Sequence, residues 1–325
     1  HCHEMPRRHE FRRHHDQRYS QLSAGPDIAV VILTLRQKEQ TLRCLEHLLQ
    51  QQNEQTEFSV LLWDNGSGDQ TATAVAAQFP EVMLHVSQTN LGVAGGRNAA
   101  AAAAINAWNP DYLLFLDNDM VVQPGFVAEL AKPLRPESGR RVGQTQAKLM
   151  LADEPGRLND GGGCRIQFWL GRTRPVGFGE VDQGQYDTPK PCVSCGGAMM
   201  VRTHLFQKLG GFDERFNPFG PEDLDFSLRL QEIGWQSWYV PAAVAVHDVN
   251  HTFGGGDYTE EYATHRSRHW LRLMRRHAGI IDWLGFVLVG APMIFGRVLA
   301  RELGKGNLGA VRGLIRGALG RRDNK

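Results

Sequence analysis

Tyr112-Leu-Leu-Phe-Leu-Asp-Asn-Asp119 is the stretch of this sequence that decides its fold and points to its chemistry. A short apolar run that ends abruptly at polar residues is typical of a strand buried on both faces of a parallel sheet. Asp117 and Asp119 follow the run and could both reach one cation. Mn2+ and Mg2+ prefer oxygen ligands and often share them with substrate phosphates. The stretch therefore predicts a metal site at a strand end, with a simple polar turn as the alternative.

The residues before this stretch repeat a strand-and-helix rhythm. Ile28–Leu33, Phe58–Trp63 and Val82–Val86 have the apolar character of strands, and an alanine-rich segment from Arg97 to Trp108 has that of a helix. Such alternation predicts a Rossmann-like α/β fold with a mainly parallel, doubly wound sheet. Ligands bind such sheets beyond the carboxyl ends of the strands. We therefore expect a nucleotide site within the first 120 residues.

The second half of the chain is less regular. Gly161–Gly179 is rich in glycine and predicts loops or short antiparallel strands. Strands are expected at Val193–Val201 and Ala242–Val246, and a helix at Glu222–Ile233.

Composition limits the classes of function. The 325 residues include 36 Lys and Arg against 35 Asp and Glu, and this balance argues against a general nucleic-acid binder. Five cysteines without framework spacing favour a reducing compartment, so we expect a cytoplasmic protein. Residues 1–27 hold five His and five Arg and predict a flexible tail.

The C-terminal part, residues 251–325, is expected to be helical and basic. Trp283–Gly296 contains no charged residue, and from Arg297 to Lys325 eight Lys or Arg oppose only Glu302 and Asp323. Basic residues beside an apolar stretch suit an anionic bilayer, so we expect peripheral association with the inner face of the plasma membrane. A helix docked on the protein core is the alternative.

Taken together, the motifs resemble glycosyltransferase family 2 with the GT-A fold, and they are similar to its bacterial rhamnosyl- and galactofuranosyltransferases. The resemblance covers about residues 28 to 248, and every motif occurs in order. The motifs are Val30-Val-Ile-Leu-Thr34, Trp63-Asp-Asn-Gly-Ser67, Asn90-Leu-Gly92, Gly96-Arg-Asn98, Leu116-Asp-Asn-Asp119, Gly196-Gly-Ala198, Gly210-Gly-Phe-Asp-Glu214, Glu222-Asp-Leu-Asp-Phe-Ser-Leu-Arg229 and Val246-His247.

The resemblance implies a GT-A nucleotide-diphospho-sugar transferase domain at residues 28–250, with a nucleotide-binding half at 28–120 and an acceptor half at 121–250. It also implies the residues that bind the donor and the divalent metal, Mn2+ or Mg2+. Donor contacts are expected from Thr34, Asp64, Asn90, Gly92, Arg97 and Asp117, and metal ligands from Asp117, Asp119 and His247. For Arg97 the alternative is a solvated helix start, and for His247 it is a hydrogen-bonded packing residue.

The resemblance places acid–base chemistry at Glu222-Asp223. A carboxylate there can accept the proton of an attacking hydroxyl, with Asp223 as the first choice and Glu222 as the second. Both acids would also suit the positive end of the helix that follows, which is the alternative. Asp225 is expected to orient Asp223 or to pair with Arg229. Gly197 and Trp169 are expected on the acceptor side, although packing would also explain Trp169.

These expectations describe an inverting, metal-dependent glycosyltransferase for cell-surface polysaccharide or glycolipid synthesis. The donor would be dTDP-rhamnose or a UDP-sugar, and the acceptor a glycan or a lipid-linked sugar. One alternative is a sugar-phosphate nucleotidyltransferase, which would need glycine in the loop Thr34-Leu-Arg-Gln-Lys-Glu39. The other is a non-catalytic protein that binds glycans or scaffolds a membrane complex.

Overall fold

The computed structural model describes residues 27–52, 56–194, 196–248, 259–306 and 308–320. The predicted flexible tail lies almost wholly outside these residues, and so does the predicted domain boundary near residue 250. Strands alternate with helices up to His247, and the described residues from Glu260 onward form helices.

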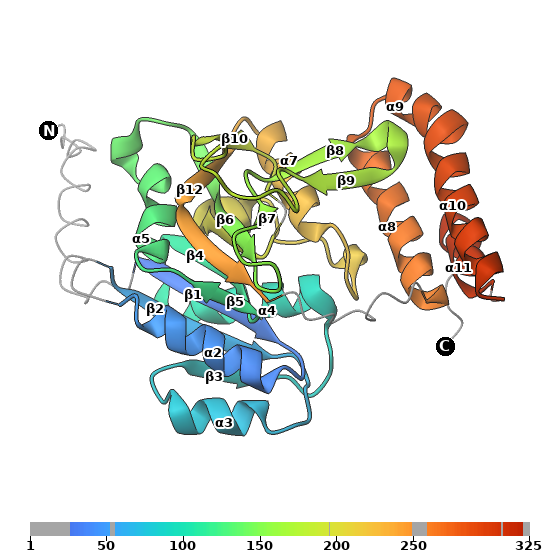
Figure 1. Ribbon diagram of the computed structural model, residues 1–325. Helices are drawn as coiled ribbons and strands as arrows, with labels where there is room; N and C mark the ends of the chain where they lie inside the picture. Colours follow the sequence, from blue (N-terminus) through green and yellow to red (C-terminus); the bar gives the residue numbers. More distant parts are fainter. Residues whose placement is uncertain (1–26, 53–55, 195, 249–258, 307, 321–325) are drawn as a thin grey trace, which may run out of the picture.

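A mixed sheet of ten strands forms the centre of the molecule (Figure 1). Its path runs β10-β12-β6-β11-β4-β1-β2-β3, with β5 paired to β12 and β7 to β6. The strands β3, β2, β1 and β4 run parallel, and β11 joins them antiparallel to β4, so both halves of the chain share one sheet. The bounds are β1 Ile28–Thr34, β2 Phe58–Asp64, β3 Met83–Val86, β4 Tyr112–Asp117, β5 Met120–Val122, β6 Val142–Leu151, β7 Leu158–Asp160, β10 Lys190–Cys192, β11 Ala198–Arg202 and β12 Gln236–His247.

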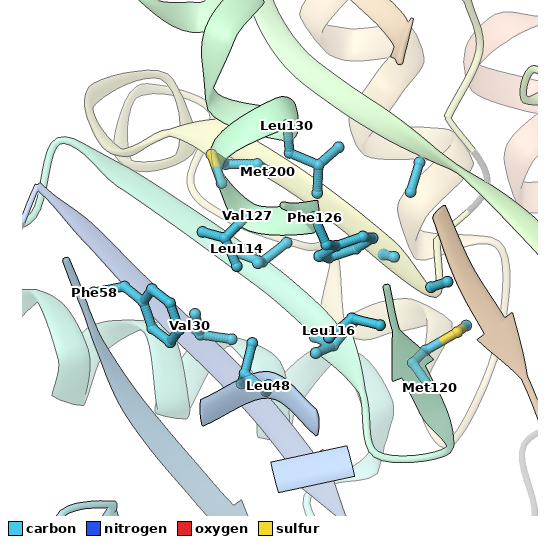
Figure 2. Close-up of a cluster of buried hydrophobic side chains, with 14 of the residues drawn as sticks. Val30, Leu48, Phe58, Leu114, Leu116, Met120, Phe126, Val127, Leu130 and Met200 are labelled. Atoms are coloured by element: carbon cyan, nitrogen blue, oxygen red, sulfur yellow. The ribbon is translucent and has the colours of Figure 1, made fainter. Parts of the chain in front are cut away.

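Successive residues of the central strands pack on opposite faces of the sheet. In β1, Val30 and Ile32 belong to one core cluster and Ala29 and Val31 to the other. Figure 2 shows the first cluster, in which Val30 lies beside Phe58 and Leu48, and Leu114 of β4 lies beside Val127 of α5. Burial on both faces is what the continuous apolar runs predict.

Helices cover both faces of the sheet. The alanine-rich α4 places Ala100, Ala101 and Ala104 in the second core cluster. Its Gly96 lies so close to the sheet that a Cβ there would come within 2.6 Å of Leu33 Cδ1. The helices of this part are α2 Lys38–Leu49, α3 Thr71–Gln78, α4 Gly92–Trp108, α5 Phe126–Ala131, α6 Thr203–Lys208 and α7 Glu222–Glu232.

Two expected strands of the second half have different bounds in the structure. The strand expected at Val193–Val201 is β11, which begins only at Ala198. The strand expected at Ala242–Val246 is the end of β12, which begins at Gln236. Pro241 interrupts the apolar pattern, and it falls where the pairing of β12 with β6 shifts register. A bulge tolerates proline, so the strand continues through it.

The C-terminal helices stand beside the hairpin of β8 (Cys164–Gln167) and β9 (Arg172–Pro175) (Figure 1). They are α8 Glu260–His277, α9 Ile280–Gly285, α10 Ala291–Gly304 and α11 Gly309–Ala318, with a π-helical segment between α9 and α10. In the described part of the chain, Ile280–Gly304 is the one helical run long and apolar enough to cross a membrane, and only 11% of its most apolar window is buried. It extends beyond the charge-free stretch that the sequence suggested, because it continues through Asp282 and Arg297.

Helix α11 packs against α8 through glycines. A Cβ at Gly313 would come within 2.2 Å of the carbonyl oxygen of Glu260, and a Cβ at Gly317 within 2.0 Å of Ser267 Oγ. The two helices can therefore approach this closely only because these positions lack side chains.

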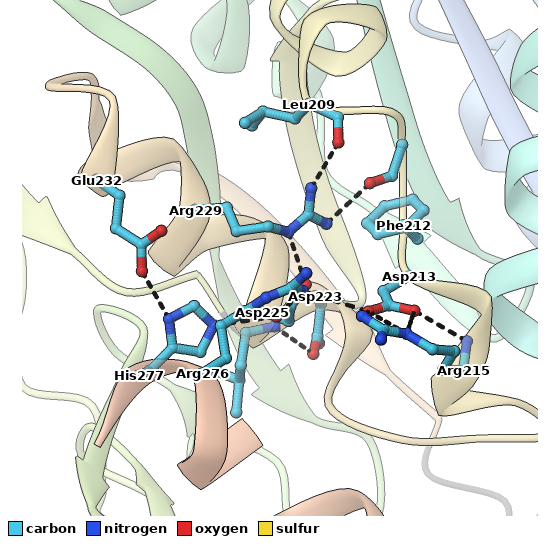
Figure 3. Close-up of polar contacts among 12 residues, drawn as sticks. Leu209, Phe212, Asp213, Arg215, Asp223, Asp225, Arg229, Glu232, Arg276 and His277 are labelled. Atoms are coloured by element: carbon cyan, nitrogen blue, oxygen red, sulfur yellow. Dashed lines mark hydrogen bonds and ion pairs between the residues drawn. The ribbon is translucent and has the colours of Figure 1, made fainter. Parts of the chain in front are cut away.

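A buried carboxylate joins α8 to α7 of the sheet domain. Asp225 of α7 is fully buried and accepts hydrogen bonds from Arg229 Nε at 2.7 Å, Arg276 Nη1 at 2.8 Å and His277 Nε2 at 3.0 Å (Figure 3). The expected pairing with Arg229 is confirmed, and Asp225 also holds two residues of α8. Burial alone would raise the pKa of Asp225, but hydrogen bonds from His277 and Arg276 and the charge of Arg229 outweigh it and lower that pKa.

Replacing this carboxylate should loosen α8. Asp225→Asn is expected to lower the free energy of unfolding by about 2–3 kcal/mol, because charged hydrogen bonds to a buried acceptor are weakened. Because the folded pKa is lowered, the contribution is present above the usual aspartate value of about 3.9 and is lost as the pH falls through the folded pKa. Urea unfolding at neutral and acidic pH measures both effects. An equal loss at every pH would contradict this account.

Candidate active site

A cavity of about 440 Å3 lies beyond the carboxyl end of β4. It brings together residues that the sequence places far apart: Asp117 from the end of β4, Glu222 and Asp223 from the start of α7, and His247 from the end of β12. The other lining residues are Arg97, Leu149, Asn159, Asp160, Cys164, Thr173, Pro175, Gly196, Gly197, Gly220, Pro221 and Leu224. The predicted catalytic residues thus share one cavity with most of the predicted metal residues.

Arg97 connects the two acidic groups of this cavity. Its Nη1 donates to Glu222 Oε1 at 2.9 Å, and its Nη2 donates to Asp117 Oδ1 at 2.5 Å. The side chain is only 9% exposed, so it is not the solvated helix start considered above. Arg97 forms ion pairs with both carboxylates. Its expected contact with a donor phosphate stays a prediction.

Asp223 and Glu222 form a buried acidic pair at the start of α7. Burial raises the pKa of both carboxyls, the neighbouring Asp223 adds to the effect at Glu222, and Arg97 partly offsets it. Glu222 Oε2 has no hydrogen-bond partner among the described residues. Asp223 Oδ1 accepts from the amide of Leu224 at 2.7 Å, and a Cβ on Gly196 would come within 2.3 Å of Asp223 Oδ2. Gly196 therefore leaves room for the carboxylate that lines the cavity.

Asp119 and His247 face each other next to this cavity. Asp119 Oδ1 lies 3.4 Å from His247 Nε2 and is buried, yet it makes no regular hydrogen bond to a described residue. His247 Nδ1 lies 3.1 Å from Asn159 Oδ1, which orients the ring with Nε2 toward Asp119. Burial lowers the pKa of His247, but the nearby carboxylate of Asp119 outweighs it and raises that pKa.

This arrangement fits a divalent cation bound jointly with a substrate. Within the described residues, no three His, Cys, Asp or Glu side chains form a complete metal site. An orphaned carboxylate oxygen, an oriented imidazole and the negative potential that raises the pKa of His247 are nevertheless what a partial site requires. Mg2+ is commonly held by one or two carboxylates, with waters and phosphates completing the shell.

Several predicted donor residues have structural partners in the protein. The Thr34 hydroxyl is buried and lies 2.8 Å from Thr41 Oγ1, and Asn118 Nδ2 donates to both hydroxyls. Asp64 Oδ1 accepts from the amide of Ser67 at 2.7 Å. These contacts shape the strand ends of β1 and β2, and the expected nucleoside contacts of Thr34 and Asp64 stay predictions.

Asn90 lies just before α4, which begins at Gly92. Asn90 Oδ1 accepts from the amide of Gly92 at 2.8 Å, and Gly92 has a φ of +76°. A Cβ on Gly92 would come within 2.4 Å of Asn217 Oδ1, which accepts from the amides of Ala94 and Gly95. Asn217 was not among the predicted site residues.

The two predicted acceptor residues lie in different places. Gly197 lines the cavity with a φ of +75°, and a Cβ there would meet Met120. Trp169 is 43% exposed, and its backbone and Cβ closely approach Gly285 and Gly290 of the C-terminal helices. It is not among the described residues that line the cavity, so its contact with an acceptor ring stays a prediction without support from its position.

Sequence reasoning missed Asn159 and the hairpin residues Thr173 and Pro175. Asn159 precedes Asp160 and three glycines, a polar turn that could have suggested a site. The hairpin residues carry no motif, and only the fold brings them to the cavity.

Comparison with known proteins agrees with this geometry. Residues 26–279 match the model of a family described as glycosyltransferase like family 2. An N-acetylglucosaminyl-diphospho-decaprenol L-rhamnosyltransferase of Mycobacterium tuberculosis is 29% identical over 236 residues, which are 68% of this chain and 76% of the relative. The O-antigen biosynthesis protein RfbC of Myxococcus xanthus is 30% identical over 63% of this chain but only 16% of its own length.

Solved structures share the fold at low sequence identity. A mannosyltransferase of Pyrobaculum calidifontis in complex with GDP-Man and Mn2+ has a TM-score of 0.54 and 14% identity, and the match covers 96% of this chain and 94% of that one. GalNAc-T7 with UDP, GalNAc and Mn2+ has a TM-score of 0.59 and 15% identity over 78% of this chain, which spans about half (48%) of that protein. The family match extends past the sheet to include α8 and favours a glycosyltransferase over a nucleotidyltransferase or a scaffold. The chain belongs to glycosyltransferase family 2, and its mixed sheet with flanking helices is a GT-A fold.

Proposed function

We propose that this glycosyltransferase transfers a sugar from a nucleotide-sugar to an acceptor hydroxyl with inversion at the anomeric carbon. The observation that carries the proposal is the shared cavity, which Asp223 lines together with Asp117 from the end of β4. A single displacement needs a base on one side of the anomeric carbon and stabilisation of the leaving diphosphate on the other. Asp223 would supply the base, and the carboxylates at the end of β4 would hold the cation that stabilises the diphosphate.

Asp223 is the proposed base. As the acceptor oxygen forms its bond to the anomeric carbon, its proton passes to a carboxylate oxygen of Asp223. The bond from the anomeric carbon to the diphosphate oxygen breaks, and its electron pair leaves with the nucleoside diphosphate. The raised pKa of Asp223 makes it a stronger base than an exposed aspartate, while it still ionises near neutral pH.

A divalent ion would be held by Asp119 and His247, with Asp117 beside them. When bound, it would neutralise charge on the leaving diphosphate as a Lewis acid. Asn159 keeps the His247 ring oriented, and Arg97 fixes the carboxylate of Asp117. The preference for Mn2+ or Mg2+ follows from the oxygen-rich ligands.

The relatives suggest the substrates. The mycobacterial relative is named for rhamnosyl transfer to a lipid-linked N-acetylglucosamine, and the Pyrobaculum calidifontis structure contains GDP-Man. We propose a dTDP-rhamnose or UDP-sugar donor and a lipid-linked diphosphate sugar as the acceptor, in the synthesis of a cell-envelope glycan.

A panel of nucleotide-sugars tests the proposal directly. The correct donor with Mn2+ should raise the free energy of unfolding by about 2.7 kcal/mol at a concentration 100-fold above its Kd, because it binds only the folded state. Asp119→Asn should remove the part of this gain that depends on the metal. Thermal shift with and without Mn2+ measures both. If no nucleotide-sugar stabilises the protein, the proposed function is wrong.

We also propose that the enzyme lies on the inner face of the plasma membrane. In the run Ile280–Gly304, Ile281 is 81% and Leu288 is 74% exposed, and basic residues of α8 precede the run. Apolar side chains exposed next to basic residues suit the surface of an anionic bilayer.

Flotation with anionic vesicles checks this placement. Leu288→Asp should weaken vesicle binding by at least about tenfold, because an aspartate enters lipid far less readily than a leucine. Val181→Asp, at a site 48% exposed on the sheet domain, is the matched control and should leave binding unchanged. Equal effects of the two variants would place the bilayer elsewhere.

A further inference from the structure

A second cavity of about 530 Å3 separates the C-terminal helices from the sheet domain. Its walls come from α8, α10 and α11 on one side, and from the β8–β9 hairpin and the segment before α7 on the other. Aromatic and aliphatic residues such as Phe219, Phe286 and Ile294 make up most of the lining. The volume falls within the range of about 300–1,000 Å3 that is usual for ligand pockets.

This apolar cavity adjoins the catalytic cavity. Thr173, Gly220, Pro221 and Leu224 line both. Pro221 and Leu224 flank the acidic pair, so the apolar cavity ends beside the proposed base. A ligand that fills it would extend to the place where the acceptor hydroxyl must be.

The other end of the apolar cavity opens on the exposed apolar surface of the helices. Phe295 of α10 and Ile315 of α11 line the cavity and are also 39% and 46% exposed. The proposed membrane-facing run Ile280–Gly304 includes Phe295. A continuous apolar path therefore leads from the surface of the C-terminal helices to the catalytic residues.

The polar groups of this cavity suit an anion. No Asp or Glu is among the described residues that line it, whereas Arg172 and Arg266 are. Trp270 also lines it, and within the described part of the chain its buried indole N–H has no hydrogen-bond acceptor. An indole N–H can only donate, so a phosphate oxygen would satisfy it.

We propose that this cavity binds the phosphate-proximal part of the acceptor's lipid chain, while the remainder of the chain extends into the bilayer. This inference rests on the proposed function, because it assigns a position to the lipid of a lipid-linked acceptor. The apolar walls would bury the first segment of the chain, and the acceptor sugar would enter the adjoining catalytic cavity.

A cavity-filling variant tests the proposal. Ala291→Trp adds bulk to the wall formed by α10, and Ala300→Trp adds the same side chain to an exposed site of that helix outside the cavity. The assay compares one acceptor diphosphate sugar on a long polyprenyl chain with the same head group on a short soluble chain. Ala291→Trp should raise the KM for the long-chain acceptor by about tenfold, the loss expected when roughly two methylenes lose their burial. The KM for the short-chain acceptor and all values for Ala300→Trp should stay within about twofold of wild type.

Each outcome bears on one claim. If the wild type transfers to neither acceptor and no donor binds, the proposed function fails. If the wild type transfers sugar but Ala291→Trp changes both acceptors equally, the cavity does not hold the chain. If Ala291→Trp weakens vesicle binding and leaves the chain-length preference intact, a bilayer lipid is the occupant and the inference is overturned.

A smaller change guards against misfolding. Should Ala291→Trp also weaken donor binding in the thermal-shift assay, Trp270→Phe takes its place, because it removes the indole N–H and keeps an aromatic ring. It should raise the KM of the long-chain diphosphate acceptor and leave donor binding unchanged. An unaltered KM would overturn the inference.

Discussion

Asp223→Asn should lower the rate of sugar transfer by about 10²- to 10⁴-fold, the usual contribution of a positioned base. The amide cannot accept the proton of the acceptor hydroxyl. It can still accept the hydrogen bond from the amide of Leu224 that Asp223 Oδ1 accepts now, so the start of α7 should keep its structure. Steady-state transfer and donor binding by thermal shift, measured on the same preparation, check the prediction.

The control is an aspartate that lies away from the proposed chemistry. Asp187 pairs with Lys148 and is 58% exposed, so Asp187→Asn should transfer sugar at the wild-type rate. Transfer by Asp223→Asn within tenfold of wild type would remove Asp223 as the base. Loss of donor binding in that variant would instead assign Asp223 to the donor site.

Arg97→Met should lower the free energy of unfolding by about 3–5 kcal/mol, because it leaves acidic partners without their cation inside the protein. Glu222 is only 4% exposed on its side chain and would lose its hydrogen bond from Arg97 Nη1. Because burial raises the pKa of Glu222 to about 8, the loss should grow as the pH rises through that value and Glu222 gains the negative charge that Arg97 balances. Urea unfolding at neutral and alkaline pH measures the difference.

An exposed ion pair provides the comparison for Arg97. Arg312 lies 3.2 Å from Glu260 and is 68% exposed, so Arg312→Met should cost less than about 1 kcal/mol. Arg97→Lys keeps a charge but loses the forked geometry that reaches both carboxylates, and it should recover only part of the stability. Equal losses for Arg97→Met and Arg312→Met would show that the connection between the acidic groups does not stabilise the fold.

The central sheet could be predicted from the sequence because each strand is marked by its own apolar run and by the polar residues that end it. Tyr112–Asp117 is apolar on both faces and stops at acidic residues, and the structure places β4 there with its end at the cavity. The same reasoning failed for the start of β12, since Pro241 disguises a strand that continues through a bulge.

The sequence predicted the individual residues of the candidate site, but it did not predict which of them contact one another. Motifs located Asp117 and Glu222, yet no local pattern reveals that Arg97 bridges them across 20 and 125 residues of chain. Trp169 illustrates the reverse problem. An exposed aromatic residue in a glycine-rich loop suggests a sugar platform, but its neighbours are helices more than 100 residues later, which local sequence cannot show.

The glycines of α11 affect the width of the apolar cavity although they do not line it. Gly313 and Gly317 fix the spacing between α11 and α8, and the same helix presents Leu314, Ile315 and Ala318 to the cavity. Alanine at either glycine would push α11 outward and widen the passage without touching its occupant. Homologous chains with bulkier residues at these two positions should therefore have a wider cavity and accept thicker or more branched lipids.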